Sequence, residues 1–353
     1  MAKILYSIQG VGMGHAMRSQ TIIKHLRSEG HEVLITANNK AYKFFKEVYK
    51  DVHELKGVSF VVDSEGKVKV FKTLAEYFKT LPKYSYYNFK KLIKIIDDFS
   101  PDLVVTDFEP FAQVISNVYN LPLISIDNQH RITHCTLDIP REYRDEYLEA
   151  KTVIRSFIWT ADYYIVTDFY NSKVRKSKEK VFVVPPVVRE GVMKTKKSNQ
   201  GHILVYMWEK YAKNLIPVLK KVKDQKFIVY GLNKSKRDGN VTLRPFSSTK
   251  MVKDLSSAKA VIANAGFTLM TESLFLHKPM LVAPMGSQFE QILNGLQLEK
   301  RDYGMMVDEI DQANIESFIK QLPRFKKAIT KVKFDDNKKL FATLDRIIKR
   351  GVK

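Results

Sequence analysis

The feature that most constrains the fold of this chain is an alternation of short apolar runs with longer segments of helical spacing. In the first half, apolar runs typical of strands occur at 3–8, 33–37, 102–106, 121–126, 163–167 and 181–184. Helical spacing of apolar residues separates them, most clearly at 16–30 and 110–119. This alternation predicts a parallel sheet with helices on both faces.

A polar, lysine-rich stretch at 189–201 interrupts this pattern, which begins again at residue 202. The second half has apolar runs at 202–206, 227–230, 241–243, 260–263 and 279–283, and helical spacing at 249–257, 269–276 and 289–300. We therefore predict two Rossmann-like α/β domains, residues 1–188 and 189–335, and a final helix in 336–353 that can pack back on the first domain. In such sheets ligands bind beyond the carboxyl ends of the strands, so the loops there should carry the chemistry.

Composition excludes several classes of protein. With a single cysteine, Cys135, the 353-residue chain can form no internal disulfide, paired-thiol redox site or cysteine zinc cluster, and a reducing cytoplasm fits best. No apolar run approaches the roughly 20 residues that cross a bilayer, so we expect a soluble or peripheral protein. The formal charge of +21 favours polyanionic partners, namely nucleic acid, anionic lipid or phosphorylated substrates. Alternatively, the positive charge reflects a lysine-rich proteome, as in hyperthermophiles, and has no role in binding a partner.

A glycine loop follows the first predicted strand. It reads Gly10-Val-Gly12-Met-Gly14-His15, and residues without Cβ let the backbone amides approach an anion or a substrate closely. The spacing differs from the dinucleotide fingerprint, and no acid ends the second strand, so NAD and FAD are disfavoured. His15 opens the helix, where the positive helix end favours a neutral imidazole. The histidine is either a general base or a residue that only caps the helix.

The second half carries a comparable set of polar groups after its strands. A strand is followed by a helix start whose amides and dipole suit a diphosphate, at Ala265, Gly266, Phe267 and Thr268. Glu272, about one turn into that helix, can reach two ribose hydroxyls or simply be solvated. Glu290 and Gln291 open a later helix and offer a carboxylate and an amide to sugar hydroxyls.

Together these motifs resemble the GT-B glycosyltransferases, in particular the family of the bacterial enzyme that forms lipid II by adding N-acetylglucosamine, and more loosely the UDP-glycosyltransferases. The glycine loop through His15 is similar to that family's amino-terminal loop. The run from Asn264 through Glu272 and Pro284 to Glu290-Gln291 and Asn294 is similar to its donor-binding signature. The resemblance implies two Rossmann-like domains whose parallel sheets face each other across a cleft.

The resemblance also implies roles for individual residues. Glu272 would bind the donor ribose, the amides of Gly266, Phe267 and Thr268 the diphosphate, and Glu290 with Gln291 the sugar. Phe246 matches a position whose backbone recognises uracil, and Arg189 resembles an arginine that neutralises phosphate. Asp107 is similar to an aspartate that orients the histidine base. Together they would support inverting transfer of a sugar from a UDP-sugar, with no cofactor or metal ion required.

The acceptor side is less sharply defined. Gly12 and Gly14 in the loop, and Asp127 and His130 after another predicted strand, are expected to face the acceptor. Between residues 67 and 94, eight lysines alternate with aromatic residues around a single acid, Glu76. This segment suits the interface of an anionic membrane or single-stranded nucleic acid, or it packs its rings on the core.

We therefore expect a lipid-linked or other membrane-proximal acceptor and a cytoplasmic protein, peripheral at the inner face of the membrane. Nucleic acid is not expected as a partner, and the sequence does not indicate an oligomeric state. Two other functions stay open. One is a UDP-sugar 2-epimerase of similar two-domain fold, which would act on its substrate without an acceptor. The other is a non-enzymatic protein that binds polyanions through its positive charge.

Overall fold

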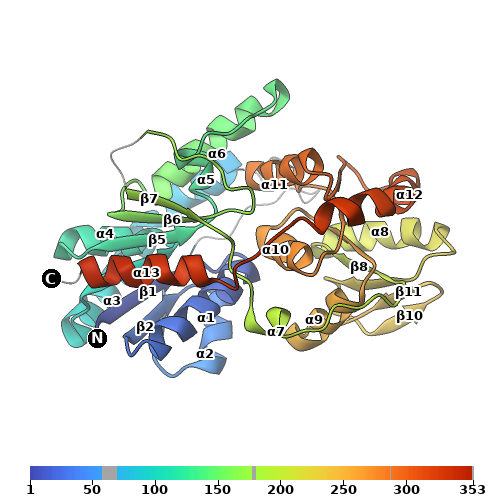
Figure 1. Cartoon of the computed structure of the whole chain (residues 1–353). Helices are drawn as coiled ribbons and strands as arrows, with labels where there is room; N and C mark the ends of the chain where they lie inside the picture. Colours follow the sequence, from blue (N-terminus) through green and yellow to red (C-terminus); the bar gives the residue numbers. More distant parts are fainter. Residues whose placement is uncertain (58–69, 177–179, 287, 352–353) are drawn as a thin grey trace. The chain divides into compact units, whose positions relative to one another are not determined.

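The computed structural model describes residues 1–57, 70–176, 180–286 and 288–351, and the backbone alone for 70–83. Two compact units are present (Figure 1). The described residues up to Val187, together with those from Asn337 onward, form the amino-terminal unit, and Val188–Asp336 form the carboxyl-terminal unit. The boundary thus falls one residue before the predicted position.

The amino-terminal unit is built on a seven-stranded sheet of order β3-β2-β1-β4-β5-β6-β7, whose strands are all parallel. Its strands are β1 (Lys3–Ile8), β2 (Glu32–Ala37), β3 (Val52–Glu54), β4 (Leu103–Asp107), β5 (Leu123–Asp127), β6 (Tyr163–Thr167) and β7 (Lys180–Val184). Its helices are α1 (Met13–Ser28), α2 (Asn39–Val48), α3 (Val70–Phe99), α4 (Pro110–Tyr119), α5 (Arg131–His134), α6 (Arg144–Phe157) and α13 (Lys338–Gly351), with a 3-10 turn at Arg141–Tyr143.

The carboxyl-terminal unit has a second seven-stranded sheet, of order β10-β11-β9-β8-β12-β13-β14. Its strands are β8 (Ile203–Tyr206), β9 (Phe227–Tyr230), β10 (Lys236–Asp238), β11 (Val241–Leu243), β12 (Ala260–Ala263), β13 (Met280–Val282) and β14 (Gly304–Met306). Only β10 is antiparallel. Its helices are α7 (Glu190–Met193), α8 (Glu209–Lys221), α9 (Ser248–Ser257), α10 (Phe267–Phe275), α11 (Phe289–Lys300) and α12 (Gln312–Ile329).

The prediction of two α/β units with parallel sheets is therefore confirmed. The strands that the sequence reading did not name are β3, β10 and β14, each three residues long. Strands β11 and β13 are equally short but fall in predicted apolar runs, whereas β3 and β10 contain charged residues and show no apolar run. The three strands not named all lie at sheet edges, where β3 pairs only with β2, β10 only with β11 and β14 only with β13.

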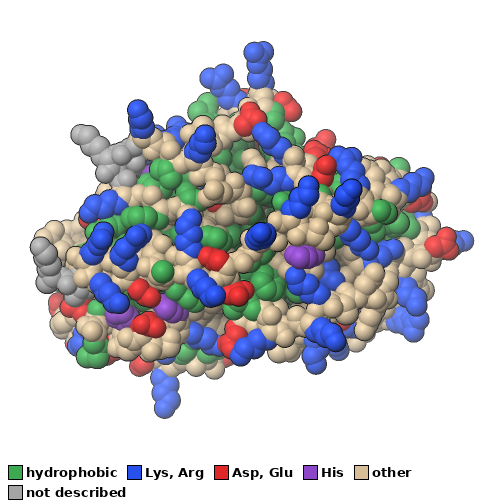
Figure 2. Space-filling model, viewed as in Figure 1, with side chains coloured by type: hydrophobic (Ala, Val, Ile, Leu, Met, Phe, Trp, Pro, Cys, Tyr) green, Lys and Arg blue, Asp and Glu red, His purple; other side chains and the backbone are tan. Residues whose placement is uncertain are grey.

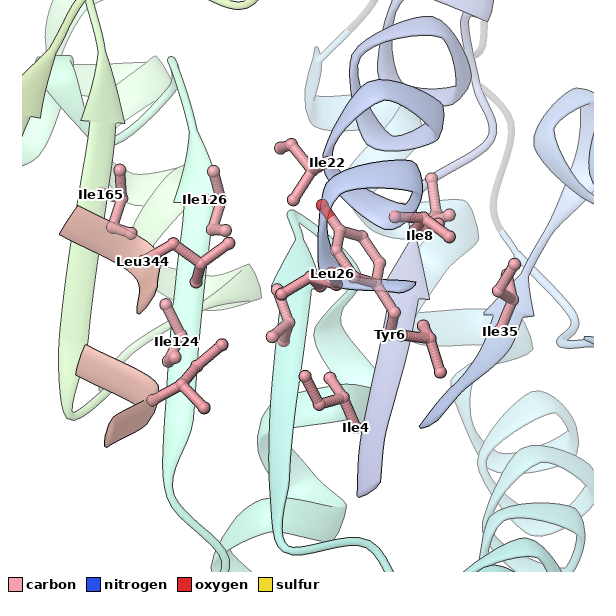
Figure 3. Close-up of a cluster of buried hydrophobic side chains, with 14 of the residues drawn as sticks. Ile4, Tyr6, Ile8, Ile22, Leu26, Ile35, Ile124, Ile126, Ile165 and Leu344 are labelled. Carbon is pink, nitrogen blue, oxygen red and sulfur yellow. The ribbon is translucent and has the colours of Figure 1, made fainter. Parts of the chain in front are cut away.

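The last helix belongs to the amino-terminal unit, where it runs beside β6 and β7 (Figure 1). Its apolar residues Leu340, Leu344, Ile347 and Ile348 recur at helical spacing and are all buried. Figure 3 shows Leu344 next to Ile126 of β5 and Ile165 of β6, in the same core as Tyr6 and Ile22. The chain thus returns from the second sheet to complete the core of the first.

This packing predicts the effect of shortening Leu344. Leu344 has no exposed surface, so L344A leaves a cavity in the core and should lower the free energy of unfolding by about 2–5 kcal/mol. Urea unfolding measures the change. K349A, an exposed substitution on the same helix, should change stability by less than about 0.5 kcal/mol. Equal stability of the two variants would contradict the packing of α13 on this sheet.

Candidate active site

The glycine loop places His15 at the start of α1. Gly10 has no room for a side chain, because a Cβ there would lie 1.7 Å from the carbonyl oxygen of Asn38. Gly12 is the N-cap of α1, and a Cβ there would meet nothing within 4 Å. The helix then begins at Met13, so Gly14 and His15 lie in its first turn. The loop is therefore closed against α2 at Gly10 and open at Gly12.

Asp107 ends β4 and meets His15 there. The Nδ1 atom of His15 lies 2.7 Å from Oδ1 of Asp107, and the two side chains are 16% and 0% exposed. Asp107 also accepts two hydrogen bonds from Arg18 and one from Ser19, so its two oxygens accept four hydrogen bonds from three residues. Burial alone would raise the pKa of Asp107, but the guanidinium charge of Arg18 and the hydrogen bonds from Arg18 and His15 hold it below the usual value. Asp107 is therefore a buried carboxylate.

This arrangement fixes one nitrogen of the imidazole. With Asp107 ionised, Nδ1 of His15 donates to the carboxylate, and Nε2 then carries the lone pair. Among the described residues, none forms a hydrogen bond to Nε2. The ring can thus accept a proton at Nε2 while Asp107 stabilises the imidazolium that results.

Asp127 and His130, which we expected to face an acceptor, are both 1% exposed. Nδ1 of His130 lies 2.6 Å from Oδ2 of Asp127, whose other oxygen accepts the backbone N–H of His130. Burial would raise the pKa of Asp127, but His130 holds it well below its usual range. Arg131 forms a second buried ion pair with Asp168, at 2.9 Å. These contacts hold the turn after β5 in shape, and neither predicted side chain is presented on the surface.

The predicted donor-binding residues all lie in the carboxyl-terminal unit. Gly266 is the N-cap of α10 and supplies no capping side chain, so the first amides of Phe267 and Thr268 are placed at a helix N-terminus. Ala265, just before them, is fully buried, and its carbonyl accepts from Asn294. The chain therefore offers the backbone geometry expected for a diphosphate site at the carboxyl end of β12.

Glu272 and Arg189 form an ion pair. Nη2 of Arg189 donates to one carboxylate oxygen of Glu272 at 2.7 Å, and Nε donates to the other. The side chain of Glu272 is 3% exposed and that of Arg189 is 16% exposed. The structure thus brings together two residues that the sequence reading assigned to different parts of the donor.

Three further predicted residues have local partners. The amide of Gln291 accepts from the backbone N–H of Met285 at 2.9 Å and donates to Gln288 at 2.6 Å, which ties down the loop before α11. Phe246 is 44% exposed, and its backbone N–H donates to the side chain of Asn233 at 3.2 Å. Glu290 lies half-buried in the first turn of α11.

The sequence reading missed Arg18, Ser19 and Asn128. Arg18 and Ser19 lie one turn beyond His15 on α1, and both side chains are buried and bound to Asp107. A signal was present, because Arg18 stands on the same helix face as His15, three residues away. Asn128 stands between Asp127 and His130, which we expected to face the acceptor, but no sequence pattern connected it with Arg18. That contact depends on the parallel pairing of β1 with β4 and of β4 with β5. Among the described residues, no group of three His, Cys, Asp or Glu side chains is arranged to hold a metal ion.

Comparison with known proteins agrees with this geometry. Residues 2–323 match the family model described as glycosyl transferase family 1. The chain belongs to glycosyl transferase family 1. It is 24% identical over 331 residues to an uncharacterized glycosyltransferase of Methanosarcina mazei, covering 86% of this chain and 85% of that one.

Solved structures share the fold. The glycotransferase of kitacinnamycin superposes with a TM-score of 0.71 at 13% identity, covering 100% of this chain and 99% of that one. Phytolacca americana UGT2, complexed with UDP-2fluoro-glucose and pterostilbene, gives a TM-score of 0.68 at 11% identity and covers 100% of both chains. The chain is therefore a GT-B glycosyltransferase, as the motifs predicted. Family membership supports sugar transfer over epimerisation and over polyanion binding without catalysis.

Glu109, two residues after Asp107, is the N-cap of α4 and is 1% exposed. Its Oε2 accepts the N–H of Ala112 at 2.9 Å, whereas Oε1 is buried with no partner among the described residues. Burial raises the pKa of Glu109 to about 7, and the amides of Ala112 and Phe111 oppose that rise. The native state therefore keeps a proton that the unfolded chain releases near pH 4.5.

The stability of the protein should depend on pH through this group. Between pH 4.5 and 7 the native state binds more protons at Glu109 than the unfolded state, so the contribution of Glu109 falls as the pH rises. In E109Q that loss is absent, and the stability of E109Q relative to the wild type should increase by about 3 kcal/mol from pH 4.5 to 8. Urea unfolding across this range measures the difference. E142Q, at an exposed position, should give a curve parallel to that of the wild type. A parallel curve for E109Q would contradict the raised pKa.

Proposed function

We propose that this glycosyltransferase moves a sugar from a UDP-sugar to a hydroxyl acceptor by an inverting displacement, with His15 as the general base. The observation that carries the proposal is the contact of Nδ1 of His15 with Oδ1 of the buried Asp107, at 2.7 Å. It leaves Nε2 as the proton acceptor. The acceptor oxygen attacks the anomeric carbon while its proton goes to Nε2, and the bond from that carbon to the diphosphate oxygen breaks.

The donor would bind at α10. The amides that begin this helix and its dipole suit a diphosphate, and the nearby Arg189 adds a positive charge as the leaving group becomes more negative. Each oxygen of Glu272 already accepts from Arg189 and can accept once more from a ribose hydroxyl. These groups could stabilise the diphosphate without a metal ion. The name of the Phytolacca americana complex, with its UDP-sugar analogue, supports UDP as the nucleotide.

The remaining predicted contacts complete the proposal. Glu290 would bind the sugar from the start of α11, while Gln291 would act by holding the preceding loop. The backbone of Phe246 would bind the uracil ring of the donor. Its N–H, which donates to Asn233 in the free protein, would then donate to the nucleotide. On the acceptor side, Gly12 offers open space beside His15, and the pair Asp127–His130 shapes the turn after β5.

The base and the donor site can be tested separately. H15A should lower turnover by about 10²–10⁴-fold with unchanged donor affinity, because only proton removal is lost. E272Q should weaken donor binding about 10- to 100-fold, because charge-assisted hydrogen bonds to the ribose are lost. Thermal shift against a panel of nucleotide sugars identifies the donor and gives its affinity, and single-turnover kinetics give the rate.

The matched control is H31A. His31 precedes β2, at the amino edge of the same sheet, and accepts the backbone N–H of Ala2. Its replacement should leave turnover within a factor of about two to three. Turnover of H15A equal to that of H31A would remove His15 from the role of base.

We further propose that the acceptor is lipid-linked or lies close to an anionic membrane surface. The predicted basic segment at 67–94 lies partly outside the described side chains. In its described part, on α3, Tyr86 and Tyr87 are 73% and 40% exposed, and the ammonium groups of Lys56 and Lys91 lie 5.4 and 5.8 Å from the Tyr87 ring. Lys and Arg outnumber Asp and Glu on the face in Figure 2, in line with the charge of +21. None of the described helices is long and apolar enough to span a bilayer.

Vesicle co-sedimentation tests this proposal. The protein should pellet with phosphatidylglycerol vesicles and not with phosphatidylcholine vesicles, because the attraction is electrostatic with aromatic anchoring. The double variant Y86S/Y87S should bind anionic vesicles severalfold more weakly. W208S, which removes an exposed aromatic ring from the carboxyl-terminal unit, is the control and should bind as the wild type does. Negligible binding to both vesicle types would rule out a membrane surface as partner.

A further inference from the structure

Arg18 is a buried cation next to the proposed base. Its residue is 5% exposed, and its three nitrogens all have protein acceptors. Nε donates to Oδ2 of Asp107 at 2.7 Å, Nη2 donates to Oδ1, and Nη1 donates to Oδ1 of Asn128. Nη2 also lies 2.9 Å from Nδ1 of His15. The guanidinium is therefore held in one orientation against both members of the His–Asp pair.

This position changes the charge balance of the pair. In an isolated His–Asp pair, the carboxylate favours the imidazolium because the two charges are opposite. Here Arg18 already neutralises the fully buried Asp107, so a proton on Nε2 of His15 would give the three groups a net charge of +1. Burial makes such a net charge costly, and the repulsion acts over only a few ångström.

The same geometry selects the tautomer. Arginine keeps its protons, so Nη2 can only donate, and both Oδ1 of Asp107 and Nδ1 of His15 lie within its reach. Nδ1 also lies 2.7 Å from Oδ1, which would place two acceptors against each other unless Nδ1 carries a proton. Nδ1 of His15 then donates to Asp107, and Nε2 has the lone pair. The other groups around this cluster are the hydroxyl of Ser19 on Asp107, the amide of Asn128 on Arg18, and the ring of Tyr6 from β1, whose pKa is raised by burial and by Asp107. Among the described residues of this cluster, Arg18 is thus the charged group that lies next to both His15 and Asp107.

We infer that Arg18 is a positioning residue that keeps His15 neutral, with its proton on Nδ1, so that Nε2 is ready to take the acceptor proton. Arg18 does this through Asp107 and is itself held by Asn128, which follows β5. His15, Asp107 and Arg18 therefore act together as three groups with no net charge. This inference rests on the proposed role of His15 as base.

Nitrogen-15 NMR of the histidine side chains tests the inference on the whole protein without any substrate. The spectrum of H15Q assigns the His15 signals among the eight histidines. In the wild type we expect the Nδ1–H tautomer. In R18M, His15 should bind its proton about tenfold more tightly or more, because a positive charge at hydrogen-bonding distance is lost. R18K keeps the charge and should change proton affinity much less.

K24M removes an exposed lysine from the same helix and should leave His15 unchanged within a factor of about two. If R18M does not fold, N128A keeps the inference testable, because it removes the acceptor that holds Nη1, and the tautomer signal of His15 should broaden or become mixed. A folded R18M in which His15 titrates as in the wild type would overturn the inference, and so would an Nε2–H tautomer in the wild type.

Kinetics then separate this inference from the proposed function. In R18M the acid limb of the pH profile of turnover should move to higher pH, with donor affinity unchanged. If NMR gives the expected tautomer and shift while H15A keeps full turnover, Arg18 controls His15 as inferred but His15 is not the base.

Discussion

The arrangement of the amino-terminal site depends on the complete burial of one carboxylate. Asp107 ends β4 with no exposed surface, and an ionised carboxylate in that position is tolerable only with several hydrogen-bond donors around it. Those donors come from Arg18, Ser19 and His15 of a single helix, α1. The hydrogen bonds to the Asp107 carboxylate therefore fix the orientation of the first turns of α1 and the position of the His15 imidazole.

The same principle recurs along the carboxyl edge of the sheet. Asp107 at the end of β4, Asp127 at the end of β5 and Asp168 after β6 are all buried, and they contact Arg18, His130 and Arg131 respectively. In the carboxyl-terminal unit, Glu272 of α10 is likewise buried against Arg189. Removing one partner of such a pair leaves an uncompensated buried charge. The resulting loss of stability is much larger than the net stabilisation that the intact pair provides. The loops at the carboxyl edges of both sheets are therefore held by charge pairing as well as by apolar packing.

The sequence predicted best those features that depend on a local pattern of residues. The long strands, the glycine loop and the helix start at Gly266 are local features, since each depends on residues within a few positions of one another. The sequence predicted less well the partners of the polar residues. Glu272 and Arg189 were assigned to ribose and phosphate separately, and Asp127 and His130 to an acceptor surface, whereas these residues contact each other. Arg189 and Glu272 are 83 positions apart, and no spacing rule connects them. Asp127 and His130 are only three residues apart, but their burial depends on the packing of the whole sheet.

By itself, the sequence determined the two α/β units and the family, because apolar periodicity and motif order are properties of the chain. Tertiary structure alone decided which charges neutralise one another. Arg18, on the helix after β1, reaches Asn128, 110 residues away, because β1, β4 and β5 pair in parallel and their carboxyl ends meet at one edge of the sheet. The protonation of an imidazole depends on the charges within a few ångström of it, and only the folded chain brings those charges together.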